Sequence, residues 1–200
     1  MSHYFDKYQE TPDQTRTIEA VIRGKRFVFS TGAGTFSPTR VDPGSMLLAE
    51  ESDVPEGADV LDLGCGYGAI GIAIAKTVPG THVALVDTNA RAVSYAEKNA
   101  TGNGVTVKIA SGDGFANLGN ALFDVILFNP PFSAGKDIWL RLIADAKGHL
   151  RDGGSLQVVA PTNKGGGIVE SELTKLFGKT TVLARKSGYR IYKAEKRPSC

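Results

Sequence analysis

The chain contains 200 residues, of which 42% are apolar, and carries a formal net charge of +2. This length and apolar content suffice for one well-buried domain rather than two, so we expect a single domain over residues 1–200, with an N-terminal extension (1–50) and a core (51–200). The longest apolar run, 69–75, is too short to span a bilayer, the N-terminus does not resemble a signal peptide, and the two cysteines are not in metal-ligand spacing. Composition therefore argues against a secreted, membrane or metal-dependent protein and predicts a cytoplasmic one.

The first 50 residues predict a helix, a strand and a second helix. Thr11-Pro12-Asp13 is typical of a helix start, and apolar residues at 18, 21 and 22 give that helix one apolar side. Residues 26–31 alternate in polarity as a strand does, and Gly32-Ala33-Gly34 ends the pattern. Residues 44–51 predict a short helix. Phe36, between these elements, is a candidate either for a lid over a bound ligand or for a core position.

From residue 59 onward, apolar strands alternate with helices. Strands are expected at 59–63, 82–86, 105–110, 123–128 and 155–160, and helices at 69–77, 91–99, 137–150 and 168–177. Near-continuous Val/Ile/Leu strands alternating with helices predict an α/β fold with a parallel sheet covered on both faces. The last two strands differ, because 180–185 and 189–194 flank Lys186-Ser187-Gly188, which is typical of a β-hairpin.

A glycine-rich loop joins the first of these strands to the first of these helices. Its sequence is Asp62-Leu63-Gly64-Cys65-Gly66-Tyr67-Gly68, and the glycines permit a tight turn with a ligand lying against the backbone and the helix N-terminus. With Gly71 the spacing also matches the dinucleotide fingerprint, and Asp87 follows at a suitable distance, which keeps a nicotinamide oxidoreductase open. Asp62 argues against it, because a carboxylate aimed at the loop would repel a pyrophosphate but attract an ammonium or sulfonium group.

Two further carboxylates follow the next two strands. Asp87 ends the second strand, where it can accept hydrogen bonds from ribose hydroxyls, and Asp113 follows the third, where it can accept from an adenine amine with Phe115 beside the ring. Helix capping or turn formation also explains an Asp at such a position. Carboxylates at three successive strand ends nevertheless favour a cationic nucleoside cofactor, S-adenosylmethionine. Its candidate contacts are Asp62, Gly64, Cys65, Gly66, Tyr67, Gly68, Asp87, Thr88, Asp113, Gly114 and Asn129.

Asn129, Pro130, Pro131 and Phe132 are the candidate catalytic residues. They follow the apolar run 123–128, where a buried strand delivers them to a cleft. The Asn side-chain oxygen and the Pro130 carbonyl offer two acceptors for the two hydrogens of a planar amine, the prolines remove competing N–H donors, and Phe132 offers a ring on which a base can stack. A proline-rich stop after a strand is the plainer explanation for these four residues.

The C-terminal part of the chain is basic. Residues 175–197 contain eight Lys or Arg and one acidic residue, whereas residues 46–174 contain nine basic and fifteen acidic residues. A basic end on an acidic body favours a polyanionic partner such as RNA, although a solvated face explains such a run as well. Candidate contacts to substrate or RNA are Phe36, Lys136, Arg185, Lys186 and Arg190.

Taken in this order, the motifs resemble those of class I methyltransferases. More narrowly, the chain resembles the small-domain family that contains the RsmC-type ribosomal RNA guanine-N2 methyltransferases and their single-domain archaeal relatives. The segments 34–37 and 42–48 resemble that family's N-terminal approach to the fold, as does 129–135, in which Ser133 stands where bacterial members commonly have His. The resemblance implies a doubly wound, Rossmann-like, seven-stranded, mostly parallel sheet with an antiparallel C-terminal hairpin. It also implies cofactor contacts from the glycine loop, Asp87, Asp113 and Asn129.

The resemblance also implies the reaction, the methylation of an exocyclic amine, most readily that of guanine in ribosomal RNA. Methylation of tRNA guanine, DNA adenine or protein glutamine stays open, as does a non-catalytic, cofactor-binding RNA-binding module. Bacterial family members carry an additional N-terminal domain that this chain is expected to lack, so substrate selection would rest on the catalytic domain. We expect no metal and a monomer or homodimer.

Overall fold

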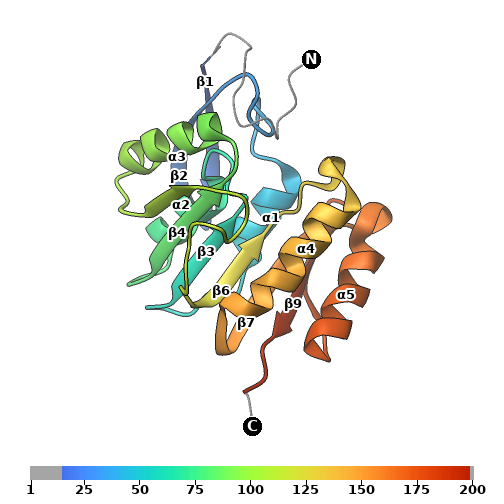
Figure 1. Cartoon of the computed structure of the whole chain (residues 1–200). Helices are drawn as coiled ribbons and strands as arrows, with labels where there is room; N and C mark the ends of the chain where they lie inside the picture. Colours follow the sequence, from blue (N-terminus) through green and yellow to red (C-terminus); the bar gives the residue numbers. More distant parts are fainter. Residues whose placement is uncertain (1–14, 199–200) are drawn as a thin grey trace.

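The computed structural model describes residues 15–198, which form a twisted seven-stranded sheet covered by helices on both faces (Figure 1). The strand order is β5-β4-β3-β6-β7-β9-β8. Neighbouring strands from β5 to β7 are parallel, whereas β9 runs antiparallel to both β7 and β8. The expected α/β fold with an antiparallel C-terminal hairpin is therefore confirmed. The strands are β3 (Asp59–Leu63), β4 (His82–Asp87), β5 (Lys108–Ser111), β6 (Phe123–Phe128), β7 (Leu150–Pro161), β8 (Thr181–Lys186) and β9 (Tyr189–Glu195).

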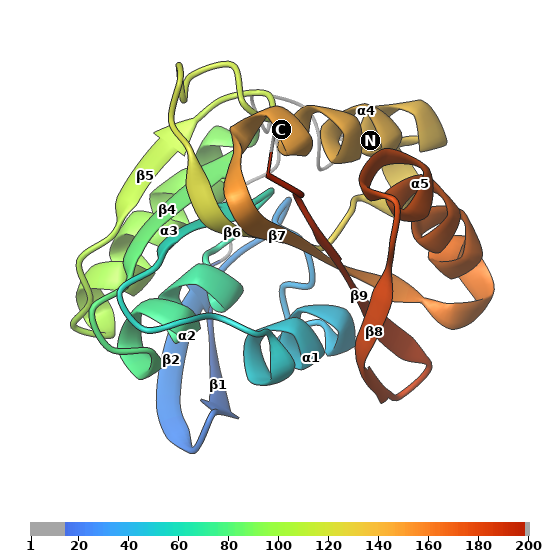
Figure 2. The ribbon, with the colours of Figure 1, turned by 90° about the horizontal axis from the view of Figure 1, so that it is seen from below.

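The helices divide between the two faces of the sheet (Figure 2). Helices α1 (Pro43–Glu51), α2 (Ala69–Thr77) and α3 (Ala90–Gly102) share one hydrophobic core. Helices α4 (Lys136–Ala146) and α5 (Gly167–Phe177) share the other core. The helix expected at 137–150 ends at Ala146 and continues as a 3₁₀ turn, and the strand expected at 105–110 begins only at Lys108. Residues 15–198 also contain three short helical segments: η1 (Phe132–Ala134), η2 (Lys147–His149) and η3 (Thr162–Gly166).

The N-terminal extension contains a β-hairpin, whose second strand was predicted at 26–31 and whose first strand lies where the sequence predicted a helix. Strands β1 (Arg16–Ile22) and β2 (Lys25–Thr31) pair antiparallel, so the helix expected to continue through residue 22 is wrong there, and its start at 11–13 lies outside the described residues. Ile18 and Ile22 are buried and Val21 is exposed. A spacing of four residues fits one side of a helix as well as one face of a strand, and only the pairing with β2 distinguishes them.

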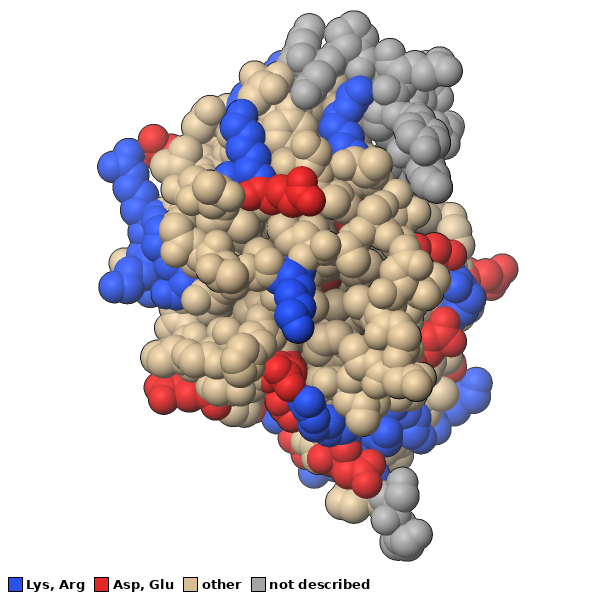
Figure 3. Space-filling model, turned by 60° about the vertical axis from the view of Figure 1, so that its left-hand side comes forward, with Lys and Arg blue, Asp and Glu red and all other residues tan. Residues whose placement is uncertain are grey.

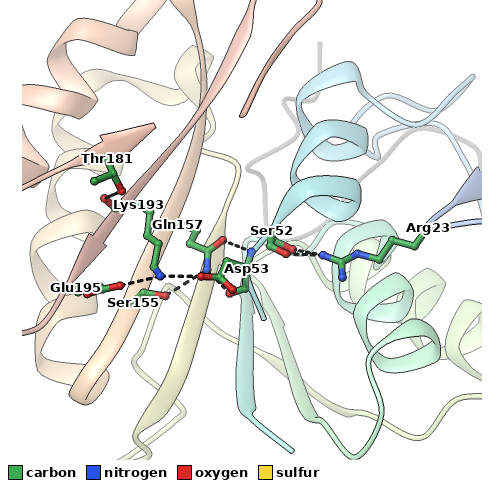
Figure 4. Close-up of polar contacts among 8 residues, drawn as sticks. All are labelled: Arg23, Ser52, Asp53, Ser155, Gln157, Thr181, Lys193 and Glu195. Carbon is green, nitrogen blue, oxygen red and sulfur yellow. Dashed lines mark hydrogen bonds and ion pairs between the residues drawn. The ribbon is translucent and has the colours of Figure 1, made fainter. Parts of the chain in front are cut away.

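A chain of polar contacts fixes this extension to the core (Figure 4). The guanidinium of Arg23 donates to the Ser52 carbonyl (2.6 Å) just after α1. The buried side chain of Gln157, on β7, donates to the Asp53 carbonyl (2.6 Å) and accepts from the Asp53 amide (2.9 Å). Lys193, on β9, forms an ion pair with the Asp53 carboxylate (2.8 Å). The segment after α1 is thereby held against the middle of the sheet, and α1 with it.

Replacing Gln157 by Leu is expected to destabilise the fold by about 2–6 kcal/mol, because two backbone groups of Asp53 lose their partners at about 1–3 kcal/mol each. Urea unfolding of the purified variant measures this loss. Arg26→Ala is the control, since it removes only the exposed ion pair with Glu19 and should cost less than about 1 kcal/mol. Equal losses in the two variants would contradict the structural role of Gln157.

Candidate functional site

A cavity of about 390 Å³ opens at the carboxyl ends of β3, β4 and β6. This volume lies within the range of small-molecule sites. The chain adds β4 and β5 on one side of β3 and then crosses over to add β6 and β7 on the other side, so the strand order reverses at β3. Ligands of open α/β sheets bind where the strand order reverses. The cavity is lined by the glycine loop and the loops after β4, β5 and β6. Further lining residues come from the segment before α1, the first turn of α1, helix α4, the end of β7 and the start of β9.

The glycine loop lies along the floor of the cavity and leads into α2. Gly68 has a φ of +92°, and a Cβ atom at this position would lie 2.7 Å from the Ile72 side chain. No other residue type therefore fits here without strain. Residues Gly64 to Tyr67 line the cavity together with Ala69 and Ile70 from the start of α2, whereas Gly68 does not. The loop thus presents its backbone and the N-terminus of α2 to the cavity.

Asp87 supports the loop from the end of β4. Its side chain is almost fully buried and lines the cavity beside Thr88. One carboxylate oxygen accepts from the Gly66 amide (2.8 Å) and the other from the Asn89 amide (2.8 Å). Because each oxygen has a second lone pair, Asp87 can hold the loop and still accept hydrogen bonds from a ligand.

Asp62 lies behind the loop and does not line the cavity, so its placement differs from the expected direct contact with a ligand cation. One of its oxygens accepts from the Gly71 amide (2.8 Å), and among the described residues the other has no hydrogen-bond partner. Burial raises the pKa of Asp62 to about 7; the bond from Gly71 opposes the shift and the nearby charge of Asp87 adds to it. Asp62 therefore anchors the start of α2 and is able to titrate near neutral pH.

The side chain of Asn129 is oriented by Asp42, just before α1, and by Ser45, inside α1. Its amide nitrogen donates to a carboxylate oxygen of Asp42 (3.1 Å) and to the Ser45 hydroxyl (2.9 Å). The same Asp42 oxygen accepts from the Ser45 backbone amide (3.0 Å) and so caps α1. Because a carboxylate only accepts hydrogen bonds, the amide nitrogen of Asn129 must face Asp42, which leaves its oxygen to act as an acceptor elsewhere.

The three residues after Asn129 form a tight turn at the edge of the cavity. The Pro130 carbonyl accepts from the Phe132 amide (2.9 Å), so only one of its lone pairs is left for a ligand. The Phe132 ring packs edge-on against Trp139, with ring centroids 5.3 Å apart. A Cβ atom at Gly165 would lie 2.7 Å from that ring. Phe132 is therefore held in place by two different segments while it lines the cavity.

Other expected site residues are only partly brought together. Phe36 lines the cavity and is 46% exposed, which suits a lid. Gly114 and Asp113 also line it, but Asp113 lies at an exposed position and forms a two-pronged ion pair with Arg141 (2.9 Å to each oxygen). Phe115 does not line the cavity; it is buried and stacks on His149, with ring centroids 4.4 Å apart.

None of the basic candidate residues lines the cavity; they are Lys136, Arg185, Lys186 and Arg190. Within residues 15–198 no group of His, Cys, Asp or Glu is arranged to hold a metal ion. No helix in the same range is long and apolar enough to cross a membrane.

Three further residues line the cavity that were not predicted from the sequence: Asp42, Ser45 and Tyr189. Asp42-Pro43-Gly44-Ser45 has the pattern of a capped helix start, but no local signal shows that its cap also binds a residue 87 positions away. Tyr189, the first residue of β9, packs its ring against Gly44. A Cβ atom at Gly44 would lie only 3.0 Å from that ring. Partial burial raises the pKa of Tyr189, the charge of Asp42 adds to the rise and that of Arg40 opposes it.

Comparison with known proteins finds a matching family and similar individual proteins. The sequence model of the family described as "Methyltransferase small domain" matches residues 26–193. The uncharacterized protein YbxB of Bacillus subtilis is 36% identical over 197 residues, 97% of this chain and 98% of that protein. Ribosomal RNA small subunit methyltransferase C of Shewanella amazonensis is 36% identical over 168 residues, 82% of this chain and 48% of that protein.

A solved structure is similar over most of the chain. It is that of the T. thermophilus 16S rRNA N2 G1207 methyltransferase (RsmC) in complex with AdoMet and guanosine. It superposes with a TM-score of 0.82 at 31% identity and covers 93% of this chain and 52% of that protein. The chain thus spans about half the length of these two methyltransferases, and nearly the whole of YbxB.

Asp62 is expected to make the stability of the fold depend on pH. Its pKa rises from an ordinary value of about 4 to about 7. At pH values between these two pKa values, Asp62 holds a proton in the folded protein that it has lost in the unfolded chain. The free energy of unfolding therefore falls as pH rises, by up to about 1.4 kcal/mol per pH unit. Asp62→Asn, which keeps an acceptor for Gly71, should abolish this part of the slope in urea unfolding between about pH 4 and 7, whereas Asp113→Asn should not. An unchanged slope in Asp62→Asn would refute the assignment.

Proposed function

Because the chain belongs to the methyltransferase small domain family, we propose that it transfers the methyl group of S-adenosylmethionine to the exocyclic amine of a guanine in ribosomal RNA. The observation that carries the proposal is the orientation of Asn129. Its amide nitrogen is held by Asp42 and Ser45, and its oxygen remains as an acceptor beside Phe132 at the edge of the cavity. The RsmC relatives named above support the choice of ribosomal RNA.

The residues of the cavity fit such a cofactor. Asp42 and Asp87 place negative charge on the cavity wall, which suits a ligand with ammonium and sulfonium groups. Asp87 would hold the ribose next to Thr88, the backbone of the glycine loop would hold the methionine part, and the segment from Gly112 to Gly114 would border the adenine. When bound, S-adenosylmethionine supplies a methyl group that is already activated by its sulfonium.

The protein then mainly needs to position the amine. The lone pair of the guanine amine is delocalised into the ring, so hydrogen bonds to the Asn129 oxygen and to the free lone pair of the Pro130 carbonyl would draw the nitrogen toward tetrahedral geometry. Stacking on Phe132 would add roughly 1–3 kcal/mol of binding, and alignment of reacting groups can lower a barrier by about 7–11 kcal/mol. A base within an RNA helix would first have to be flipped out at a cost of a few kcal/mol.

No side chain is required to remove a proton before the methyl group is transferred. Among the described residues that line the cavity there is no His, Lys or Glu. The product ammonium is acidic and can lose its proton to solvent after the transfer. Positioning and electrostatics would therefore account for the catalysis.

The proposal is tested by offering the purified protein labelled S-adenosylmethionine with ribosomal subunits, naked ribosomal RNA, tRNA, DNA and a protein extract. The expected product is N2-methylguanosine in ribosomal RNA, identified by digestion and mass spectrometry. Label in tRNA guanine, methyladenine or methylglutamine would change the substrate and keep the reaction type. Cofactor binding without label in any acceptor would instead favour a non-catalytic RNA-binding module.

Asn129→Ala and Asp42→Ala are expected to separate binding from turnover. Asn129→Ala removes the acceptor and should lower kcat by about two orders of magnitude or more, as loss of one positioned polar group does in other enzymes. Asp42→Ala leaves the amide of Asn129 without its charged partner and should lower kcat to a smaller extent, while loss of the helix cap costs about 0.5–2 kcal/mol of stability. Calorimetry should show that Asn129→Ala still binds S-adenosylmethionine. Wild-type turnover in Asn129→Ala would eliminate the proposed role.

A further inference from the structure

The tip of the β8–β9 hairpin is a rigid, basic projection beside the cavity. Ser187 and Gly188 form its two-residue turn, both with positive φ (+51° and +80°), which matches the twist of antiparallel strands. The turn is attached to η3 by a hydrogen bond from the Thr162 amide to the Gly188 carbonyl (2.8 Å). Tyr189, the residue after the turn, lines the cavity. The hairpin tip is therefore fixed relative to the cavity.

Strand pairing places the basic residues of this tip on both sides of the hairpin. Lys186 pairs with Tyr189 and so lies on the side of the hairpin that faces the cavity and α1. Arg185 pairs with Arg190 on the opposite side, where Tyr192, two residues further along β9, approaches Gly166 of η3. Like charges directly opposite each other on neighbouring strands destabilise a hairpin. A polyanion bound at this point would relieve that repulsion.

Two cations from other segments adjoin the same tip. Arg40 precedes α1 and lies close enough to Tyr189 for its charge to act on the tyrosine hydroxyl. Lys164 belongs to η3, two residues after Thr162, whose amide is bonded to the turn, and next to Gly165, which packs against the Phe132 ring. We name Arg40, Lys164, Arg185, Lys186 and Arg190 the basic rim. Within residues 15–198, none of these five side chains forms an ion pair with a carboxylate.

Positive charge alone does not distinguish the rim from the rest of the surface. On the face shown in Figure 3, basic and acidic side chains are interspersed, and several other cations of the chain, such as Arg151 and Lys193, are neutralised by carboxylates. The rim differs because its cations lack such partners and adjoin a cavity whose wall includes the aromatic rings of Phe36, Phe132 and Tyr189. Rings that can stack on bases, next to cations that can contact phosphates, are the combination used to bind single-stranded nucleic acid.

Building on the proposed function, we propose that the basic rim binds the phosphate backbone of single-stranded RNA on either side of the nucleotide whose base enters the cavity. The contacts are to phosphates and carry no base specificity of their own. The rim thus supplies affinity and positions the strand, while the cavity selects the base.

Two double variants test this proposal by fluorescence anisotropy with a labelled single-stranded RNA over a series of salt concentrations. Arg185→Gln/Arg190→Gln and Arg40→Gln/Lys164→Gln each remove two rim charges from different segments. Each should weaken binding about tenfold near 0.15 M salt and reduce the slope of log affinity against log salt by about 1.4, from a contribution of about 0.7 per phosphate contact on a single strand. Affinity for S-adenosylmethionine should not change.

Lys25→Gln/Lys179→Gln is the matched control. Lys25 lies next to the β1–β2 turn, whose Arg23 contacts the C-terminal end of α1, and Lys179 precedes β8 at the end opposite the hairpin tip. The control should bind RNA as the wild type does. Wild-type affinity and salt slope in both rim variants would overturn the proposal. The proposal would also be overturned if duplex DNA bound as tightly as single-stranded RNA and lost as much affinity in the rim variants. RNA binding that depends on the rim without any methyl transfer would leave this inference standing and remove the proposed function.

Discussion

One carboxylate oxygen of Asp42 accepts hydrogen bonds from the backbone of α1 and from the side chain of Asn129. The first bond fixes the start of a helix that belongs to the N-terminal extension, and the second fixes the orientation of the amide at the end of β6. Without Asp42, Asn129 would lose the charged group that distinguishes its nitrogen from its oxygen. The extension is therefore part of the site, and its attachment through Gln157 and Arg23 at the other end of α1 supports the geometry of the cavity.

Two buried carboxylates, those of Asp62 and Asp87, act on the backbone in a similar way. Asp87 holds the Gly66 amide, and Asp62 holds the Gly71 amide at the start of α2. Each bond is made in a buried setting, where a hydrogen bond contributes more than at the surface and an unpaired group costs more. The conformation of the glycine loop is thus fixed before any ligand arrives, so binding has less conformational entropy to remove.

Much of this architecture could be predicted from sequence, and the reasons are local. The limits of β3, α2 and β6 were predicted correctly because glycines or prolines adjoin strongly apolar runs at those points. Strand β1 was mistaken for a helix because Ile18 and Ile22 have a spacing compatible with both structures, whereas β2 was predicted as a strand. Spacing alone also fails to show which way a side chain points. Asp62 faces the interior and Asp113 faces Arg141, although both occupy the expected strand ends. Asp42 and Tyr189 were missed because only the folded chain brings them to Asn129 and Gly44.

The distribution of charge between the cavity and its surroundings bears on which part of a nucleic acid could enter the cavity. Asp42 and Asp87 contribute carboxylates to the cavity wall, whereas the basic rim lies outside it. A phosphate that moved from the rim into the cavity would leave favourable cations and approach these carboxylates, which would repel it. A neutral base and a cationic cofactor meet no such barrier. The same arrangement would therefore keep an RNA backbone at the surface while its base enters. The base and the backbone would be distinguished by repulsion of the phosphate from the cavity as well as by its attraction to the rim.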